Sequence, residues 1–468
     1  MSMPTRAGAM LAGCCLTGVA AAAAPLATLL LEEQRNLPAI FPPFAPTSMA
    51  AASLHSNGAG FVIKAASNSG DFFWGAADAV TTDGQLYGLV GIATGNATTS
   101  SLPMAALAGD GRVLFSTASV PYRLWQIPPG GATGPGTTLA QAGTALPAPL
   151  AAALAAAPGA VFGNFLSTFS VSDGQPVWRA TWDIVPPAGG STFPPNWSLI
   201  KGAADGVGAA APQVLVAPGQ QFADVPNPVA STTSIRAYGF TSVGVARTGD
   251  DHIVEVYMTR TGGVTANDDS VLVRNGAGLV LAGALVRERS LIPEAIGGLP
   301  GEDFRTFKAA HASATGDYGF RVQAFRPGPT FNELLFINGA LALREGDVLA
   351  FEGESYTLGG GNLDYELQFN SDGDWVTNWN ANGERDVIIA NGRIVAATGA
   401  TPVDSTGDGV ADTQIGLTAL VIDRLAITDR RADGSFDVLF QAFGSGATEF
   451  RQGVYAVTVD QIFGDGFE

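Results

Sequence analysis

The segment "VDSTGDGVADT" (residues 403–413) has the residue types and the spacing of a loop that binds a metal ion. Asp404, Asp408 and Asp412 recur at every fourth residue, and Gly409 stands where an aspartate-rich calcium loop bends sharply. The third position lacks the usual Asp or Asn, and the distal Glu of a complete EF-hand is missing. The segment predicts calcium binding at the three aspartates, with a polar loop that contains Asp-Gly turns as the alternative.

Histidines and serines do not form a complete catalytic motif. His55, His252 and His311 lie far apart, so a triad or a zinc site would require distant parts of the chain to converge. We expect them at isolated, hydrogen-bonded positions. "SLIK" (198–201) matches the Ser-x-x-Lys of serine acyl enzymes, but it lies in a strand-like segment and has no Ser-Asp-Asn partner, so we interpret it as coincidental. The sequence also lacks a Walker loop, a G-x-S-x-G elbow and an H-E-x-x-H motif.

Aspartates accompany a turn that recurs along the chain. Each stands directly beside a turn glycine, at Asp110, Asp173, Asp250, Asp317, Asp372 and Asp433. Asp favours such positions because its side chain accepts hydrogen bonds from the turn backbone, so we interpret the series as structural. The alternative is a ring of carboxyl groups that act together.

Composition and charge exclude whole classes of function. The chain has 468 residues, and 42 acidic against 24 basic residues give it a net charge of −18, which argues against nucleic-acid binding. Gly (60 residues) and Pro (28 residues) are abundant and charged residues make up only 14%, a profile typical of many short strands joined by tight turns. A hydrophobic content of 46% provides a core and excludes general disorder.

The first 24 residues have the layout of a secretory signal peptide. A positively charged start, "MSMPTR", precedes the apolar run "AGAMLAGCCLTGVAAAAA", and small residues lead into Pro25. We expect cleavage among Ala21 to Ala24 and an exported mature chain, extracellular or at the cell surface, with no transmembrane segment. "LAGC" (11–14) resembles a lipobox, so anchoring as a lipoprotein through Cys14 is the alternative. Cys14 and Cys15 are the only cysteines, so ordinary cleavage leaves a chain without disulfides.

A repeat of about sixty residues organises the remainder of the chain. A polar turn ending in Gly precedes an alternating strand seven times, at Gly58, Gly111, Gly174, Gly249, Gly316, Gly373 and Gly434. Asn-Gly pairs at 275–276, 338–339 and 391–392 predict two-residue hairpins, because that turn requires positive φ at both central positions. We therefore predict seven units in residues 25–459, beginning near 57, 110, 173, 248, 315, 372 and 433, followed by a tail (460–468). A longer connection in the second unit predicts a short helix between Pro149 and Pro158.

The two ends of the repeat region complement each other. "LATLLLEEQRNLP" (26–38) matches the last strand element of a unit but follows no unit, whereas the seventh unit lacks that element. An N-terminal strand that completes the final unit closes a ring and removes exposed sheet edges. We predict a single all-β domain, a β-propeller of seven four-stranded blades, in which residues 26–31 share a sheet with residues 436–440. An open β-solenoid and two β-sandwiches are the alternatives.

The Asn/Asp-x-x-Gly turns and the "QAF" phrases (323–325 and 441–443) resemble the secreted bacterial choice-of-anchor tandem-repeat proteins, in which an N-x-x-G-x-x-A-F phrase recurs. The final "DQIFGDGFE" (460–468) resembles an "IF-x-DGFE" ending of exported proteins of some Gram-negative bacteria. The resemblance implies a secreted or surface-associated protein, and it transfers no catalytic residue. We expect residues 462–468 to act in export or attachment, with packing of Ile462 and Phe463 against the ring as the alternative.

The sequence carries a clear structural repeat but no complete set of catalytic residues. This combination predicts a non-enzymatic binding module. We expect a monomer that binds an extracellular glycan or protein and does not bind nucleic acid, with calcium as the one candidate cofactor. The alternative function is a hydrolase or lyase of extracellular polysaccharide, with paired carboxyl groups from several blades in the central funnel. Two carboxyl groups about 5 to 10 Å apart in an open pocket, one with a raised pKa, would favour the enzyme.

Overall fold

The computed structural model describes residues 25–32, 46–48, 54–67, 70–89, 105–117, 122–129, 136–183, 196–204, 211–218, 220, 222, 224–225, 235–260, 270–326, 331–360, 366–382, 385–416, 424–445 and 450–460. The predicted signal peptide, with Cys14, and the tail beyond Asp460 lie outside these residues.

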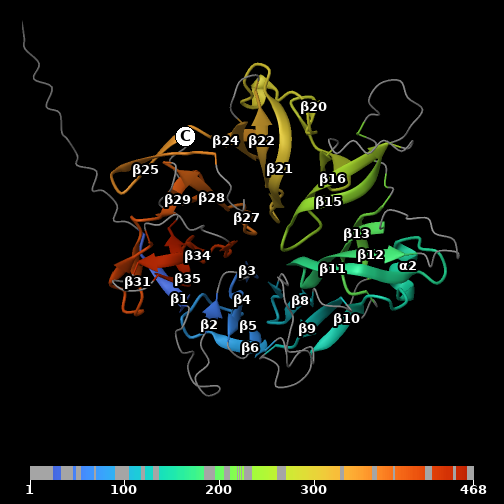
Figure 1. Cartoon of the computed structure of the whole chain (residues 1–468), viewed down its shortest axis with the longest axis horizontal. Helices are drawn as coiled ribbons and strands as arrows, with labels where there is room; N and C mark the ends of the chain where they lie inside the picture. Colours follow the sequence, from blue (N-terminus) through green and yellow to red (C-terminus); the bar gives the residue numbers. More distant parts are fainter. Residues whose placement is uncertain are drawn as a thin grey trace, which may run out of the picture.

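Seven sheets, whose blade strands pair antiparallel, surround a central axis, which confirms the predicted seven-bladed β-propeller (Figure 1). Blade 1 consists of β2 (Pro46–Ser48) and β3 (Leu54–Ser56), which both pair with β4, then β4 (Phe61–Ser67), β5 (Gly70–Ala76) and β6 (Gln85–Leu89). Blade 2 consists of β7 (Ala105–Leu107), β8 (Val113–Thr117), β9 (Arg123–Ile127) and β10 (Thr137–Gln141). Blade 3 consists of β11 (Val161–Ser172), β12 (Gln175–Asp183), β13 (Asn196–Lys201) and β14 (Gln213–Val216).

The later blades carry additional hairpins. Blade 4 consists of β15 (Ile235–Val245), β16 (His252–Arg260), β17 (Ser270–Arg274) and β18 (Ala277–Gly278), followed by the hairpin β19 (Val280–Leu281) and β20 (Ala284–Leu285). Blade 5 consists of β21 (Asp303–Ala312), β22 (Tyr318–Phe325), β23 (Phe331–Ile337) and β24 (Ala340–Arg344), followed by the hairpin β25 (Val348–Phe351) and β26 (Glu354–Thr357). Blade 6 consists of β27 (Leu367–Phe369), β28 (Trp375–Ala381), β29 (Arg385–Ala390) and β30 (Arg393–Ala397).

The seventh blade closes the ring with the N-terminal strand, as predicted. Its order is β33 (Leu425–Ile427), β34 (Phe436–Ser445), β35 (Phe450–Val459) and β1 (Ala27–Glu32), and β1 pairs antiparallel with β35. The pair β31 (Pro402–Asp404) and β32 (Thr413–Gln414) extends this sheet, because β31 pairs parallel with β1. Closure therefore joins the two ends of the repeat region in one sheet.

Helix is scarce in the described residues. The connection after β10 contains the α-helix α2 (Ala148–Ala153), in the segment where a short helix was predicted, and η1 (Glu294–Ile296) is a 3-10 turn. Among the described residues, none of the helices is long and apolar enough to cross a membrane.

The seven turn glycines lie between the first and second strands of the blades. All seven have φ between +69° and +104°, a region that residues with a side chain rarely adopt, which explains why glycine recurs there. Each blade therefore includes one strand upstream of its repeated turn, and the units counted from the glycines are offset from the blades by that strand.

The Asn-Gly hairpins also tie the third and fourth strands to the second. In blade 5, Asn338 and Gly339 have φ of +50° and +80°, as a two-residue hairpin requires. The Asn338 side chain accepts a hydrogen bond from the N–H of Tyr318 (2.9 Å), and its own N–H donates to the Tyr318 carbonyl (2.8 Å). Asn275 and Asn391 make the same pair of bonds to the first residue of β16 and of β28.

Apolar layers between neighbouring blades form the core. Middle strands such as β17 ("SVLVR") and β29 ("RDVIIA") are apolar on both faces, because each blade packs between two others. The layer between blades 6 and 7, for example, joins Val376 and Ile388 to Val438 and Val457, all with 0% exposure. Burying a side chain of this size stabilises the fold by about 1.5–3 kcal/mol.

Basic side chains link consecutive turns on one face of the ring. Arg112 of blade 2 donates to the Gly174 carbonyl of blade 3 (3.0 Å), and Lys201 of blade 3 donates to the Gly249 carbonyl of blade 4 (2.7 Å). Arg274 of blade 4 donates to the turn-glycine carbonyl of blade 5 (2.6 Å). These bonds hold neighbouring blades in register.

Candidate functional site

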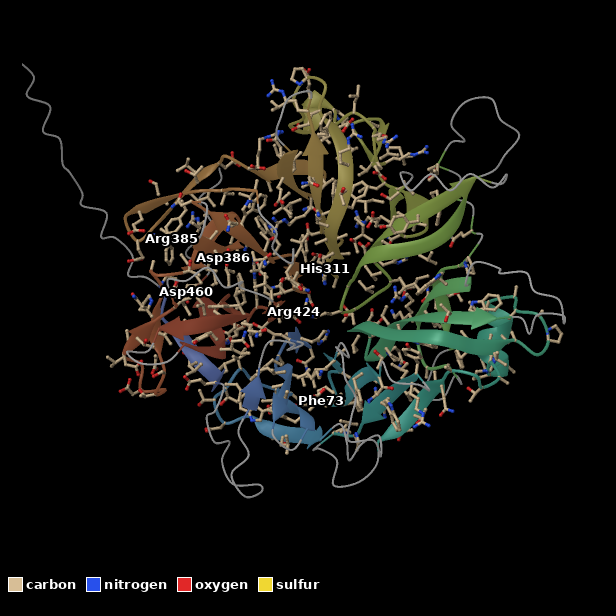
Figure 2. The ribbon with its side chains drawn as sticks, viewed as in Figure 1. Phe73, His311, Arg385, Asp386, Arg424 and Asp460 are labelled. Carbon is tan, nitrogen blue, oxygen red and sulfur yellow. The ribbon has the colours of Figure 1, made fainter. Side chains whose placement is uncertain are left out.

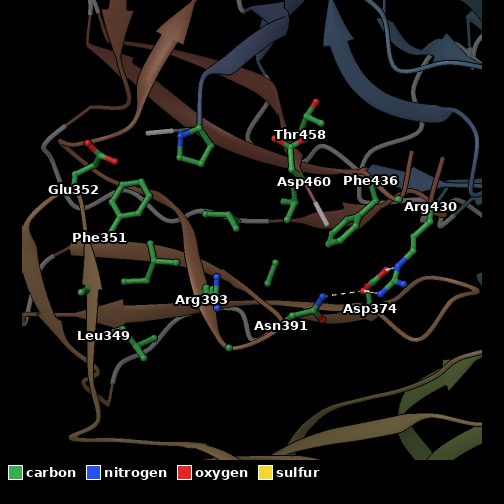
Figure 3. A pocket seen from close by; sticks show the side chains of 18 of the residues that line it. Leu349, Phe351, Glu352, Asp374, Asn391, Arg393, Arg430, Phe436, Thr458 and Asp460 are labelled. Carbon is green, nitrogen blue, oxygen red and sulfur yellow. Dashed lines mark hydrogen bonds and ion pairs between the residues drawn. The ribbon is translucent and has the colours of Figure 1, made fainter. Parts of the chain in front are cut away.

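A cavity of about 430 Å³ lies between blades 6 and 7 (Figure 3). Blade 6 contributes the Asn-Gly turn at 391–392 and the start of β30, and blade 7 contributes the start of β34 and the end of β35. The hairpin strand β25 and Pro25, which precedes the closing strand, complete the lining. The cavity therefore forms where ring closure brings both ends of the repeat region against the outer hairpin.

The wall of the cavity is apolar and continuous with the core. Ala390, Val395, Phe436 and Val459 line it, and all four belong to the apolar layer between blades 6 and 7. Phe351 of β25 faces the cavity from the hairpin and is 7% exposed. An apolar group that enters the cavity would extend this layer.

The opposite end of the cavity is polar. Arg430 donates two hydrogen bonds to the Asp374 carboxylate, from Nε (2.7 Å) and Nη2 (2.6 Å), and Asn391 donates a third (2.8 Å). Burial alone raises the pKa of Asp374, but the hydrogen bonds from Arg430, Asn370 and Asn391 outweigh that effect and lower the pKa below its ordinary value. Asp374 is therefore a fixed negative charge that holds Arg430 against the cavity.

Two strand edges border the cavity. β25 pairs only with β26, and β30 is the outermost strand of blade 6, in the part of the chain that the structure describes. In the β25–β26 hairpin, Leu358 donates its N–H to the Asp347 carbonyl (2.8 Å). Hydrogen-bonded and non-hydrogen-bonded pairs alternate along an antiparallel ladder, so the backbone groups of Val348 and Ala350 point away from β26. Val348 is 61% exposed at this edge.

Asp374 does not have the properties of the general acid of a glycosidase. Of the carboxyl groups that line the cavity, Asp374 has a lowered pKa, whereas a general acid requires a raised one. Among the described residues, burial raises the pKa of the Asp437 carboxyl, but this buried group accepts hydrogen bonds from Thr458 and Arg431 and does not line the cavity. The arrangement is suited to binding an apolar group beside an ion pair.

The predicted calcium loop lies at the outer edge of blade 7, away from this cavity. The Asp404 carboxylate accepts hydrogen bonds from the backbone N–H groups of residues 406, 407, 408 and 409, at 2.6 to 3.3 Å. Asp408 accepts one from Val410, and Asp412 binds Ser405. Within the described residues, no group of three or more His, Cys, Asp or Glu side chains is arranged to hold a metal. Calcium binding by Asp404, Asp408 and Asp412 stays a prediction.

The turn aspartates accept hydrogen bonds within the structure, which agrees with the interpretation that they have a structural role. Asp433 accepts bonds from the N–H and hydroxyl of Ser435, and Asp372 accepts one from the N–H of Arg430. Asp173 and Asp250 share the ammonium of Lys201, at 2.6 and 2.9 Å. Lys201 therefore has a structural partner on each side, in agreement with the coincidental interpretation of "SLIK".

His55 and His311 lie near the axis, each at a hydrogen-bonded position. His55 in β3 and His311 in β21 lie on innermost strands, and each Nδ1 accepts an N–H from the innermost strand of the next blade, at 3.1 and 3.3 Å. Figure 2 shows His311 beside the axis, whereas Asp460 lies far from it. Burial first, and then the charge of Arg247, lower the pKa of both histidines to about 3. His252 lies apart from them, at the start of β16.

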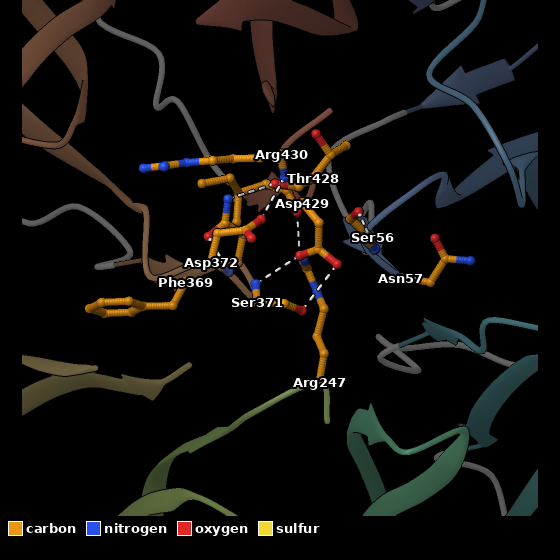
Figure 4. A network of polar contacts seen from close by, with 12 residues as sticks. Ser56, Asn57, Arg247, Phe369, Ser371, Asp372, Thr428, Asp429 and Arg430 are labelled. Carbon is orange, nitrogen blue, oxygen red and sulfur yellow. Dashed lines mark hydrogen bonds and ion pairs between the residues drawn. The ribbon is translucent and has the colours of Figure 1, made fainter. Parts of the chain in front are cut away.

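Arg247 crosses the axis and joins opposite blades (Figure 4). It lies in the turn of blade 4, yet its guanidinium pairs with Asp429 in the turn of blade 7 (2.5 Å) and donates to the Ile427 carbonyl. Ser371 of blade 6 donates two hydrogen bonds to the same carboxylate, at 2.7 and 3.0 Å, and the Asp429 N–H donates to Gly58 of blade 1 (2.7 Å). The network connects four blades and has the character of a structural clamp.

Sequence reasoning missed the residues of the cavity. Asn391 belongs to a predicted Asn-Gly hairpin, whereas Asp374, which follows the turn glycine Gly373, and Arg430 belong to no predicted site. Their convergence follows from the packing of blade 6 against blade 7, for which the sequence carries no local signal.

Comparison with known proteins identifies no family. No family model matches the chain, and no curated protein matches it. Solved structures similar to it include a mutant of AofleA from Arthrobotrys oligospora, with 10% identity, 88% of this chain and 87% of the other covered, and a TM-score of 0.31. A protein of unknown function from Dyadobacter fermentans has 10% identity, coverage of 93% and 98%, and a TM-score of 0.30. Prolyl oligopeptidase B from Galerina marginata has 8% identity, coverage of 88% and 51%, and a TM-score of 0.35. At these values we infer no ligand and no activity from them.

Proposed function

We propose that the protein is an exported, non-catalytic β-propeller that binds an extended peptide segment of another protein in the cavity between blades 6 and 7. One observation carries the proposal: a cavity with an apolar wall lies between the edge strands β25 and β30. The signal-like residues 1–24 and the net charge of −18 support an exported protein that does not bind nucleic acid.

A peptide fits this cavity better than a glycan does. An extended peptide adds a strand to an exposed sheet edge, so its backbone pairs with groups such as those of Val348 and Ala350, while its alternate side chains enter apolar pockets. A sugar ring needs an exposed aromatic face and several unoccupied polar groups. The aromatic rings at the cavity, Phe351 and Phe436, are only 7% and 3% exposed, and Asn391 and Asp374 already bind each other.

Binding of synthetic peptides tests the proposal. The probe is an array of peptides of about ten residues with apolar side chains at alternate positions, and fluorescence anisotropy measures the affinities of those that bind. Ala350→Pro removes a backbone donor from the edge of β25, and we expect it to weaken binding at least about tenfold.

The chain offers a matched control on another hairpin. Val280 of β19 pairs with Leu285 one residue from a two-residue turn, as Ala350 pairs with Ser355 in the hairpin β25–β26, but Val280 does not line the cavity. Val280→Pro should leave peptide affinity unchanged. An equal loss of peptide affinity in both variants would refute the proposal. Binding of glycans on an array, without any binding of peptides, would refute it as well. Cleavage of a polysaccharide by the purified protein would support the hydrolase or lyase alternative instead.

A further inference from the structure

We infer that the C-terminal segment of this chain, residues 461–468, occupies the cavity between blades 6 and 7 and competes there with outside ligands. The inference rests on the proposed function, since it concerns regulation of the same site. Asp460 is the last described residue, and both it and Val459 line the cavity. The chain therefore leaves β35 at the cavity itself.

Length permits this occupancy. Eight residues follow Asp460, and an extended chain of that length spans about 26 Å. Strand β25 has four residues, so an extended partner strand of the same length covers its edge with about 13 Å of chain. The segment can therefore reach along β25 without a linker.

The side chains of the segment match the wall of the cavity. "QIFGDGFE" places Ile462, Phe463 and Phe467 among small and acidic residues, and the wall consists largely of apolar side chains. Gly464 and Gly466 carry no Cβ, which allows close approach to an edge strand. These three apolar side chains would be removed from water in the cavity, a favourable change.

Charge bears on the direction in which the segment lies. The cavity lining carries Arg393 and Arg430 as cations and Glu352, Asp374 and Asp460 as anions, and Asp374 is already paired with Arg430. The acidic end of the segment is repelled by Glu352, at the turn of the hairpin. We therefore expect Glu468 to lie away from Glu352.

Tethering favours this occupant over the same segment of a second copy. A segment joined directly to the cavity has an effective concentration in the millimolar range, well above that of free protein in a binding assay. Even if the affinity of the segment for the cavity is modest, the tethered segment therefore occupies the cavity most of the time. An outside peptide must displace it, so the segment acts as a built-in competitor.

The experiment compares the full chain with a chain that ends at Asp460. The probe is the synthetic peptide QIFGDGFE, labelled at its N-terminus and followed by fluorescence anisotropy. We expect the shortened chain to bind the probe, and the full chain to bind it at least about tenfold more weakly because its own segment competes. The full-length double variant Phe463→Ser, Phe467→Ser should behave like the shortened chain, which separates lost contacts from lost length.

Results that contradict this inference differ from those that contradict the proposed function. Equal binding of the probe by the full and shortened chains, or no binding by either, overturns the inference. If array peptides still bind in a manner that depends on Ala350, the proposed function stands without it. Failure of all peptides on both chains overturns the proposed function as well. Competition that appears only as the concentration of the full chain rises would assign the segment to a second copy and overturn occupancy within one chain.

Discussion

The pKa values of His55 and His311 differ strongly between the unfolded and the folded chain. Their pKa falls from an ordinary value of 6.5 to about 3, first through burial and then through Arg247. Below pH 6.5 the two histidines therefore bind protons in the unfolded chain but not in the folded chain. Stability is fully present above that pH and is lost as the pH falls towards 3.

Replacement of both histidines by asparagine tests this linkage. Asn retains an acceptor for the N–H groups of Leu107 and Phe369 but does not titrate. Between pH 6.5 and pH 5 we expect the unfolding free energy of the parent protein to fall about 1 kcal/mol per pH unit per histidine more steeply than that of the variant. A difference of one whole bound proton corresponds to about 1.4 kcal/mol per pH unit, and the histidines of the unfolded chain are only partly protonated over this range. Urea unfolding at several pH values measures it. Parallel pH profiles of the two proteins would contradict the prediction.

Asp404, Asp408 and Asp412 form the second set of residues with predicted chemistry. We expect weak calcium binding, because three carboxylates lie on one short loop and hard cations prefer oxygen ligands. Calcium would have to replace the backbone bonds that Asp404 accepts. Isothermal titration calorimetry of the parent protein, the Asp408→Ala variant and an Asp433→Ala control checks it. An unchanged heat in Asp408→Ala, or no heat in the parent, would exclude the site.

At the scale of the element, the asparagine of the Asn-Gly hairpin has two structural roles. Asn338 adopts a positive φ, and its side chain caps the N–H of Tyr318 at the start of the second strand. Asn338→Gly keeps the first property and loses the second, and Asn338→Ala loses both. We expect the glycine variant to lose about 1 kcal/mol of unfolding free energy and the alanine variant about 1 kcal/mol more. Denaturant midpoints provide the measurement, and an alanine variant as stable as the glycine variant would show that backbone strain plays no part.

At the scale of the whole molecule, the ring has two independent closures. The closing strand β1 joins the two ends of the repeat region at the periphery, and Arg247 joins blades 4 and 7 across the axis. The second closure is partly buried, because the side chains of Arg247 and Asp429 are 12% and 33% exposed. An unpaired charge left at such a site costs more than one left at the surface.

A comparison of two ion pairs tests the clamp. We expect Arg247→Met to lower the unfolding free energy by about 2 kcal/mol, less than for a fully buried pair because Asp429 keeps its bonds from Ser371. Arg385→Met breaks the exposed pair with Glu354, and we expect it to lower the unfolding free energy less than Arg247→Met does, because solvent screens an exposed pair. The urea midpoints of both variants give the comparison, and equal losses would mean that the position across the axis adds nothing.

The fold could be predicted from the sequence because its signals are local. Positive φ at Gly58 and the other turn glycines, and at Asn338 with Gly339, follows from the backbone preferences of single residues. The missing last strand of the seventh unit and the unassigned strand at 27–32 could be matched by pattern alone. Sequence by itself therefore determined an all-β chain, the number of blades and the strand that closes them.

Only the tertiary structure decided which side chains meet. Arg247 and Asp429 are separated by 182 positions, and the cavity combines Pro25 with residues near 350, 391, 430 and 459. His55 and His311 approach the axis from blades 1 and 5 for the same reason. Turn and strand preferences act over a few residues, whereas these contacts depend on how the blades pack once the ring has closed. The repeat therefore predicts the scaffold, and the packing of unlike blades against one another creates the clamp and the cavity.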